Sequence, residues 1–318
     1  MSHWQPNAAL ATLEARAALY QEIRQYFTNR GVLEVETPLL CSSGITDPFI
    51  EPLLVESGYS VSQSRYLQTS PEYAMKRLLA AGSGPIYQIA RAFRDGEVGR
   101  RHNPEFTLLE WYQPGFDHHQ LMDQVADLVG AVLNRSGYEK LSYRQLFLEV
   151  LDLDPLTCEI AELEARVRAI TDPGDLRGNR DCWLNLLLTH EIEPSLGGRG
   201  MVFVYDYPAS QAALARVDMV DGVNLARRFE LYVDGLELAN GYFELTDAGE
   251  QRSRFERDNE QRTLEGIEPR PLDEKLLAAM VAGIPDCSGV ALGLDRLLML
   301  REGLDDISQT LSFSWDRC

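Results

Sequence analysis

A hairpin predicted over residues 86–112 constrains the fold more than any other feature of the sequence. Two runs with strand character, IYQIARAFR and EFTLLEWY, stand on either side of a short loop rich in glycine and arginine. Runs separated by so few residues pair as antiparallel strands. Because side chains alternate between the faces of a strand, one face is predicted to carry Gln88, Ala90, Ala92 and Arg94 together with Phe106, Leu108, Glu110 and Tyr112.

The remaining elements place the chain in the α+β class. Helical periodicity marks residues 8–30, which end at Gly31, residues 70–82, which begin with Ser-Pro-Glu, and residues 121–132. VLEVETP and MVFVYDYP are predicted strands, FELYVDGLELANG a predicted hairpin, and GVALGLDRLLML a predicted strand that runs into a helix. Strands joined by hairpins, with helices between them, favour a mainly antiparallel sheet. We expect residues 1–318 to form a single domain in which about 150–200 is a helical insertion.

Composition limits the possible classes of function. The 49 Asp and Glu residues outnumber the 30 Lys and Arg residues, which gives a formal net charge of −19. Such a chain repels a polyanion at long range, so broad nucleic-acid binding is not expected. A local basic pocket for a small phosphate compound is compatible with this charge, because short-range fields are set by neighbouring groups.

Nothing in the sequence predicts a membrane or an oxidising compartment. No apolar run approaches the roughly 18 residues of a membrane span, and the start, MSHWQPNAAL, lacks the pattern of a signal peptide. The five cysteines are scattered and never form a Cys-x-x-Cys pair, which disfavours disulfides and structural zinc. We therefore expect a cytoplasmic protein without a membrane partner.

The hairpin loop concentrates positive charge in this acidic chain. Arg94, Arg100, Arg101 and His102 fall within a few residues of one another, around two glycines. The planar guanidinium group of arginine matches phosphate oxygens. The loop is therefore a candidate phosphate site; the alternative is a solvated loop with an ion pair between Arg94 and Glu110.

A second candidate site lies on the Asp234-Gly235 hairpin. A two-residue turn there pairs Val233 with Leu236, Tyr232 with Glu237 and Glu230 with Ala239. Glu230 and Glu237 then share a face, where two carboxylates repel unless something offsets them. Mg²⁺ bound to ATP phosphates would do so. The alternative is that this is simply the solvated face of the hairpin.

The third candidate site is the segment GVALGLDRLLML. Gly289, Ala291 and Gly293 alternate, so one strand face has almost no side chains and a ligand can lie flat against it. Arg296 follows at the start of the predicted helix. The alternative is close packing of strand and helix, with Arg296 paired to an acid.

In this order, the segments resemble the three motifs of class II aminoacyl-tRNA synthetases. GVLEVETPLL resembles motif 1, FRDGE together with RRHNPEFTLLEWY resembles motif 2, and GVALGLDRLLML resembles motif 3. SPEYAMKRLL, RHNPEFT, ELANGYFEL and GLDRLLML are most similar to the catalytic domain of lysyl-tRNA synthetases. The resemblance covers nearly the whole chain and implies the catalytic fold of that class, an antiparallel sheet flanked by helices.

The resemblance also implies roles for individual residues. It implies that Arg94 holds the α-phosphate of ATP, and that Arg296 holds the γ-phosphate and stacks on adenine. Other implied ATP contacts are His102, Asn103 and Phe106, which would stack on the other face of the adenine. Gly96 stands where the family has glutamate, so the neighbouring Glu97 is the implied contact at this position. Implied Mg²⁺ ligands are Glu230 and Glu237. Implied amino-acid contacts are Glu72, Glu110, Tyr112, Asn240 and Glu244, with Ala291 where lysyl-tRNA synthetases have glycine. Because Glu237 and Glu244 differ in strand parity, a bulge is predicted near Asn240-Gly241. For Glu72 the alternative is an acid favoured by the helix dipole.

The architecture further resembles the elongation factor P–(R)-β-lysine ligases, synthetase paralogues without an anticodon-binding domain. The motif 1 helix starts almost at the first residue of the sequence, and no further domain is expected. This resemblance implies that lysine or (R)-β-lysine is activated with ATP and attached to a lysine of elongation factor P, with no tRNA as partner. Motif 1 implies a homodimer. The alternatives are a truncated synthetase or amide ligase with a tRNA or small-molecule acceptor, and a non-catalytic amino-acid sensor.

Overall fold

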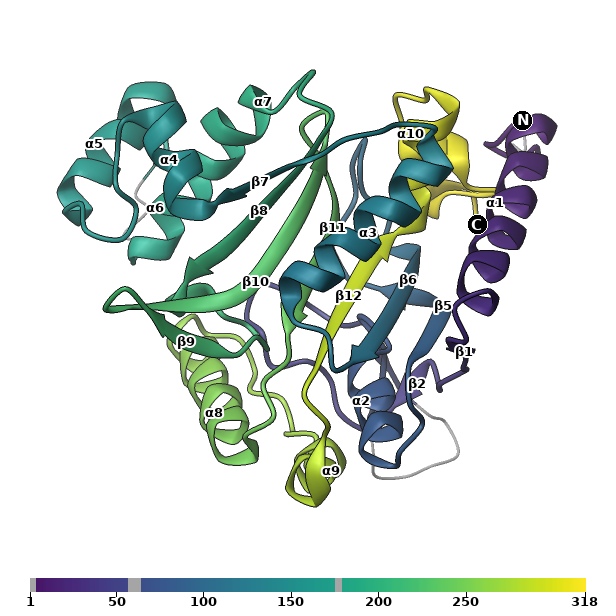
Figure 1. Ribbon diagram of the computed structural model, residues 1–318, viewed down its shortest axis with the longest axis horizontal. Helices are drawn as coiled ribbons and strands as arrows, with labels where there is room; N and C mark the ends of the chain where they lie inside the picture. Colours follow the sequence, from purple (N-terminus) through teal and green to yellow (C-terminus); the bar gives the residue numbers. More distant parts are fainter. Residues whose placement is uncertain (1–3, 57–63, 175–178) are drawn as a thin grey trace. The chain divides into compact units, whose positions relative to one another are not determined.

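The computed structural model describes residues 4–56, 64–174 and 179–318 (Figure 1). The chain divides into two compact units. Unit 1 comprises Met1–Phe116, Asp127–Arg135 and Thr246–Cys318, and unit 2 comprises Asp117–Ala126 and Ser136–Leu245. Helix α3 (His118–Leu133) contributes residues to both units.

Unit 1 contains the predicted antiparallel hairpin. Its strands lie in the order β1 (Leu33–Glu34), β5 (Ile86–Phe93), β6 (Glu105–Pro114) and β12 (Cys287–Gly293). β1 runs parallel to β5, whereas β6 is antiparallel to both β5 and β12. Only two residues of the predicted strand VLEVETP pair in this sheet. A small antiparallel sheet is formed by β2 (Leu40–Cys41), β4 (Arg65–Leu67) and β3 (Leu54–Val55).

The helices of unit 1 include those predicted over residues 8–30 and 70–82 and after the strand GVALG, and others that were not predicted. They are α1 (Leu10–Thr28), α2 (Glu72–Ala80), α8 (Ala248–Leu264), α9 (Glu274–Gly283), α10 (Leu294–Glu302) and the short 3-10 helices η3 (Ile307–Thr310) and η4 (Trp315–Arg317). Gly31, with φ +67°, follows α1 as predicted for a helix end. Pro71 lies just before α2 and not inside its first turn, and Ser70 Oγ accepts the Glu72 N–H at 3.2 Å.

Unit 2 has its own set of strands and its own core. The strands lie in the order β11 (Leu236–Phe243), β10 (Val223–Val233), β8 (Met201–Pro208) and β7 (Glu139–Ser142), and β9 (Val217–Val220) also pairs with β10. The helices are α4 (Tyr143–Leu151), α5 (Ile160–Ile170), α6 (Arg180–Leu187), η1 (Leu188–Ile192), α7 (Glu193–Ser195) and η2 (Ala209–Gln211). The described part of residues 150–200 is mostly helical, as predicted. Buried Phe147, Trp183 and Leu187 pack in a cluster with Val202 and Tyr232 of the strands.

The turn between β10 and β11 has the predicted form. Asp234 and Gly235 have φ values of +50° and +80°, which both residues of a type I′ turn require. Val233 pairs with Leu236 and Tyr232 with Glu237, as predicted.

Beyond those two pairs the predicted register is wrong. The pairing shifts between Leu231 and Tyr232, so Glu230 lies opposite Asn240 and not opposite Ala239. The extra residue on β11 is Leu238, which makes a bulge two residues before the predicted position. The bulge reverses the alternation beyond it, so Asn240 joins the face that carries Glu230, Tyr232 and Glu237. The need for a bulge was predictable, whereas its position was not.

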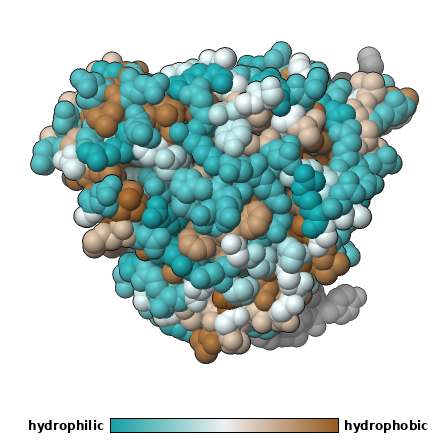
Figure 2. All heavy atoms as spheres, viewed as in Figure 1, coloured by the Kyte–Doolittle hydropathy of each residue, from teal (hydrophilic) through white to brown (hydrophobic). Residues whose placement is uncertain are grey.

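The viewed surface is largely polar. Figure 2 shows hydrophilic residues over most of this face, with only scattered apolar groups. Among the residues that the structure describes, no helix has both the length and the hydropathy of a membrane span.

Candidate active site

The candidate site in unit 1 is built on one face of its sheet. In the observed register, Gln88 lies opposite Glu110, and Glu110 lies opposite Ala291, so three strands contribute to one row. The same alternation places Leu108 beside Ala90, on the face predicted for both, and beside Gly293 of β12.

Glu110 is the acidic group of this face. It is only 2% exposed, and its Oε1 accepts a hydrogen bond from the Tyr112 hydroxyl at 2.7 Å. Across the row, Gln88 accepts a hydrogen bond from the Thr37 hydroxyl at 2.9 Å. Ala291 lies beside Glu110 and Gly289 beside Tyr112. Because both residues are small, they leave room for a ligand next to the buried carboxylate. This arrangement suits an amine that lies against the sheet.

Arg94 lies at the end of this face. Its guanidinium carbon is 5.1 Å from the centre of the Phe106 ring, and Nη1 is 3.6 Å from a carboxylate oxygen of Glu97. Arg94 is thus placed beside an aromatic face and an acid of the hairpin loop. All three residues were predicted to contact ATP.

Arg296 reaches the same loop from α10. Its Nη2 is 2.7 Å from Nε2 of His102, and its Nε donates to the carbonyl of Arg101 at 3.3 Å. A guanidinium group can only donate, so His102 accepts through Nε2 and its proton lies on Nδ1. Burial, with the positive charge of Arg296 and of Arg94, lowers the pKa of His102. The positive charges of both predicted phosphate arginines therefore favour the neutral form of His102.

Asp295 anchors this region and was missed by the sequence analysis. It is 2% exposed, accepts the Thr107 N–H at 2.7 Å, and forms an ion pair with Arg16 of α1. These bonds fix the start of α10 against β6 directly beside Arg296 and Phe106. No local signal could have found them, because Arg16 and Asp295 are 279 residues apart.

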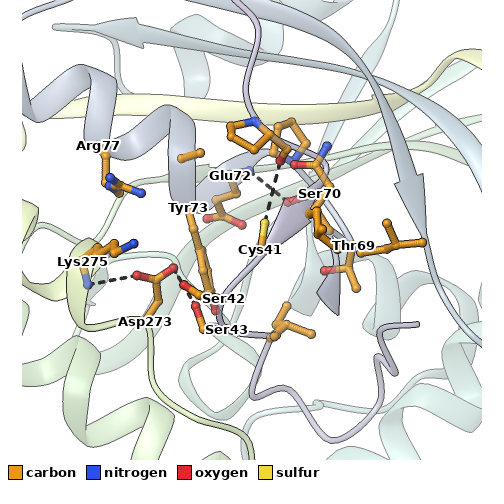
Figure 3. A pocket seen from close by; sticks show the side chains of 18 residues that line it. Cys41, Ser42, Ser43, Thr69, Ser70, Glu72, Tyr73, Arg77, Asp273 and Lys275 are labelled. Atoms are coloured by element: carbon orange, nitrogen blue, oxygen red, sulfur yellow. Dashed lines mark hydrogen bonds between the residues drawn. The ribbon is translucent and has the colours of Figure 1, made fainter. Parts of the chain in front are cut away.

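Glu72 lines a cavity of about 170 Å³ at the start of α2 (Figure 3). Its Oε1 is 2.6 Å from Nζ of Lys76, whose side chain is only 2% exposed. A buried ammonium group requires such a partner. Glu72 therefore has a structural role as the partner of Lys76 within one turn of α2, in addition to either of its predicted roles, the amino-acid contact or the acid favoured by the helix dipole.

The opposite wall of this cavity is polar. Ser43 donates a hydrogen bond to Asp273 at 2.9 Å, and Figure 3 shows Arg77 and Lys275 on the same side as Asp273. Tyr73 also lines the cavity, and burial, together with the charge of Glu72, raises its pKa well above the usual value. Apart from Glu72, none of these residues was a predicted site residue.

In unit 2, Glu230 is buried and accepts three side-chain hydrogen bonds. The hydroxyls of Tyr207 and Tyr232 donate to Oε2 at 2.7 and 2.6 Å, and Arg228 pairs with Oε1. Burial and the charge of Glu230 raise the pKa of both tyrosines far above its usual value, so both stay protonated. Burial alone would lower the pKa of Arg228, but the charge of Glu230 raises it.

The other predicted residues of unit 2 lie on the same side of the hairpin. Glu237 pairs with Tyr232, and its charge also acts on Arg228, so the two acids are neighbours. Beyond the bulge, Asn240 lies opposite Glu230. Glu244 is 1% exposed and pairs with Ala215 in an isolated bridge.

The donor chemistry of Glu230 and Glu237 fits a hard cation such as Mg²⁺. Oε2 of Glu230 takes two hydroxyls and Oε1 pairs with Arg228, so an ion would have to share Oε1 with Arg228 or displace it, and would also meet the carboxylate of Glu237. Among residues 4–56, 64–174 and 179–318 there is no group of three His, Cys, Asp or Glu side chains suited to a metal. Two carboxylates are nevertheless enough when phosphate oxygens complete the shell.

Comparison with known proteins decides the family. The model of the family described as tRNA synthetases class II (D, K and N) matches residues 3–317. The chain belongs to this class II tRNA synthetase family. The match spans both units, and the α+β class II fold expected from the sequence is confirmed.

Two relatives of this class II chain are similar to it over nearly their whole length. A protein of Proteus mirabilis (strain HI4320) is 50% identical, over 98% of this chain and 98% of its own. A protein of Salmonella typhi is 48% identical, over 99% of this chain and 98% of its own. Both are named elongation factor P–(R)-β-lysine ligase. This is the group that the sequence was found to resemble.

Proposed function

We propose that this chain is an AMP-forming ligase that activates lysine or (R)-β-lysine with ATP and transfers it to a lysine side chain of elongation factor P. The main support is the identity of 48–50%, over nearly the full chain, to relatives with that name. The grouping of Arg94, His102 and Arg296 beside Phe106 agrees with it, because it provides cations and an aromatic face for a nucleotide.

In the first step, a carboxylate oxygen of the amino acid attacks the α-phosphorus of ATP. The bond to the bridging oxygen breaks, pyrophosphate leaves, and an aminoacyl-adenylate forms. No general base is needed, because the carboxylate is already ionised near neutral pH. Arg94 would hold the α-phosphate and Arg296 the γ-phosphate, so catalysis is positioning and charge stabilisation.

The nucleotide base would lie between Phe106 and Arg296, with Glu97, His102 and Asn103 nearby. Within unit 1, the amino acid would lie over the small residues of β12, with Glu72 and Glu110 holding its amines and Tyr112 beside them. In unit 2, Asn240 and Glu244 are the proposed amino-acid contacts. Three acids against a substrate with two amines favour a diamino acid over a neutral one.

Glu230 and Glu237 would hold Mg²⁺. When bound, the ion would offset the negative charge of the triphosphate. Within the described structure, the tyrosine hydroxyls and Arg228 already orient Glu230, so the acid is held in one position before any ligand arrives.

In the second step, the neutral ε-amine of the acceptor lysine attacks the adenylate carbonyl. A C–N bond forms, the C–O bond to phosphate breaks, AMP leaves, and the nitrogen loses a proton to solvent. The net charge of −19 supports a protein acceptor over tRNA.

The proposal is tested in two assays. The first measures the exchange of pyrophosphate with ATP in the presence of each amino acid in turn, and the second measures the transfer of the activated amino acid to elongation factor P or to tRNA. Exchange with lysine or (R)-β-lysine, and then labelling of elongation factor P but not tRNA, is the expected result. Labelling of tRNA, or of neither macromolecule, would instead support the truncated synthetase or the small-molecule ligase. Absence of exchange with every amino acid would support the amino-acid sensor.

Two variants sharpen this test. Arg94→Ala should abolish exchange, and near-normal exchange would remove its proposed role. Ala291→Gly deletes the methyl group opposite Glu110 in the register. We propose that this methyl favours the shifted amine of (R)-β-lysine, so the variant should bind the two isomers more equally; an unchanged preference would contradict the idea.

We further propose that the chain is a cytoplasmic homodimer that uses the motif 1 segment as its interface. Leu33, Leu39 and Leu40 of that segment are 56%, 39% and 48% exposed. Three exposed leucines within eight residues support a covered surface, because apolar groups gathered in this way mark association sites.

A further inference from the structure

The residues after α10 return to the loop that carries His102. The Ile307 N–H donates to the carbonyl of Arg100 at 2.9 Å, and Nη2 of Arg100 donates to the carbonyl of Asp305 at 3.3 Å. The loop is therefore supported by a segment some 200 residues away in the chain.

Asn103 makes a buried contact between the two segments. It is 8% exposed, and both ends of its carboxamide are engaged. Nδ2 donates to the carbonyl of Glu105 at 2.7 Å, and Oδ1 accepts the main-chain N–H of Trp315 at 3.0 Å. The side chain thus faces the C-terminal segment, with one N–H donor and its oxygen each bonded within the protein.

The C-terminal segment is itself firmly held. The Asn7 N–H donates to the carbonyl of Ser312 at 2.8 Å, and the Ser314 N–H donates to Oδ1 of Asn7 at 3.0 Å. The Arg16 guanidinium, which also pairs with Asp295, donates to the carbonyl of Thr310. A partner fixed in this way can position the side chain bonded to it.

Asn103 stands next to His102, which contacts Arg296, and three residues before Phe106, which lies against Arg94. We propose that Asn103 is a positioning residue for nucleotide binding that acts through the main-chain N–H of Trp315, and that its carboxamide does not itself contact ATP. The inference rests on the proposed use of ATP, and it differs from the direct contact implied by the family resemblance.

The decisive variants are Trp315→Pro and its control Trp315→Ala. Proline lacks the N–H that Asn103 accepts, whereas alanine keeps it. Trp315 is the first residue of η4, where proline is tolerated, and Ser314 already has the extended ψ of 168° that proline favours before it. Trp315 is 57% exposed, so both variants should fold.

The readout is the dissociation constant for ATP, from calorimetric titration of the whole protein, together with KM for ATP and for lysine in exchange. Trp315→Pro should weaken ATP binding about fivefold, the effect of one net hydrogen bond. It should leave KM for lysine unchanged, and Trp315→Ala should behave like wild type. Asn103→Ala should weaken ATP binding to a similar extent, and the double variant Asn103→Ala/Trp315→Pro should be no worse than Asn103→Ala alone.

Other outcomes would overturn the inference. Loss of ATP binding in Asn103→Ala but not in Trp315→Pro, or additive losses in the double variant, would show that Asn103 contacts ATP directly. An equal rise of KM for lysine in Trp315→Pro would show a general disturbance instead of nucleotide positioning. A wild-type protein that binds ATP but labels no elongation factor P contradicts the proposed function alone, because the titration needs only the nucleotide.

Discussion

His102 lies where burial and two arginines act on one imidazole. Because its folded-state pKa lies below the usual 6.5, the unfolded chain takes up this proton first as the pH falls. The free energy of unfolding should therefore decrease as the pH drops from about 7 through 6.5 toward the folded pKa. His102→Gln should remove this part of the slope, which is at most about 1.4 kcal/mol per pH unit. Urea unfolding between pH 5.5 and 7.5 measures it.

Two further observations bear on this prediction. The pKa of His119 is also lowered, by burial and by His118, so part of the wild-type slope must persist in His102→Gln. Arg296→Met removes one positive charge beside His102 and should flatten the slope in part. An unchanged slope in both variants would mean that His102 does not titrate with a lowered pKa.

The Glu72–Lys76 pair predicts an asymmetry between its two partners. Glu72→Gln leaves a buried ammonium group without this carboxylate, which should cost about 3 kcal/mol or more of unfolding free energy. Lys76→Met should cost less, because Glu72 lines a cavity where water can hydrate it. Lys275→Met, at an exposed lysine on the same cavity, is the matched control and should stay within about 0.5 kcal/mol. Equal costs for the two partners would contradict this account.

Predictions for single residues were correct where they depended only on neighbouring residues in the sequence. The alternation of small residues in β12 and of Glu110 and Tyr112 in β6 is set by strand geometry alone, and the observed register agrees with it. The spacing of Glu72 and Lys76 permits an ion pair, but the burial of Lys76 follows only from packing. Asp295 was missed because its partner lies 279 residues away.

At the scale of elements, turns were easier to predict than bulges. Asp-Gly specifies a type I′ turn, so the first two pairs of the β10–β11 hairpin were correct. The predicted pair of Glu230 with Ala239 was wrong, because an extra residue enters the ladder at Leu238. Nothing in the local sequence distinguishes this position from its neighbours. The bulge matters for function because it places Asn240 on the side of Glu230.

Two Asp-Gly turns in unit 2 provide a matched comparison. Gly235 and Gly222 have nearly the same φ, +80° and +83°, but a Cβ at Gly235 would lie 2.8 Å from the carbonyl oxygen of Glu193, whereas Gly222 has open space. Gly222→Ala should cost about 1 kcal/mol from backbone strain. Gly235→Ala should cost clearly more, because the backbone of α7 must also move. Chemical denaturation of the two variants measures the difference, and equal losses would show that α7 yields freely.

At the scale of the whole molecule, the proposed dimer gives the strongest prediction. Leu40→Asp places a charge among the exposed leucines of motif 1, where burial of an unpaired carboxylate is costly. The variant should sediment as a monomer in analytical ultracentrifugation at concentrations where the wild type is a dimer. Because Leu40 is 48% exposed, the fold of the monomer should be kept.

Val281→Asp is the matched control for Leu40→Asp, since Val281 is 78% exposed on α9, away from motif 1 in the sequence. It should leave the sedimentation of the wild type unchanged. A wild-type protein that is monomeric at all concentrations would remove the proposed interface. A Leu40→Asp variant that remains dimeric would instead place the interface on another surface. Either result leaves the nucleotide site untouched, because Arg94, His102 and Arg296 meet within one unit of one chain.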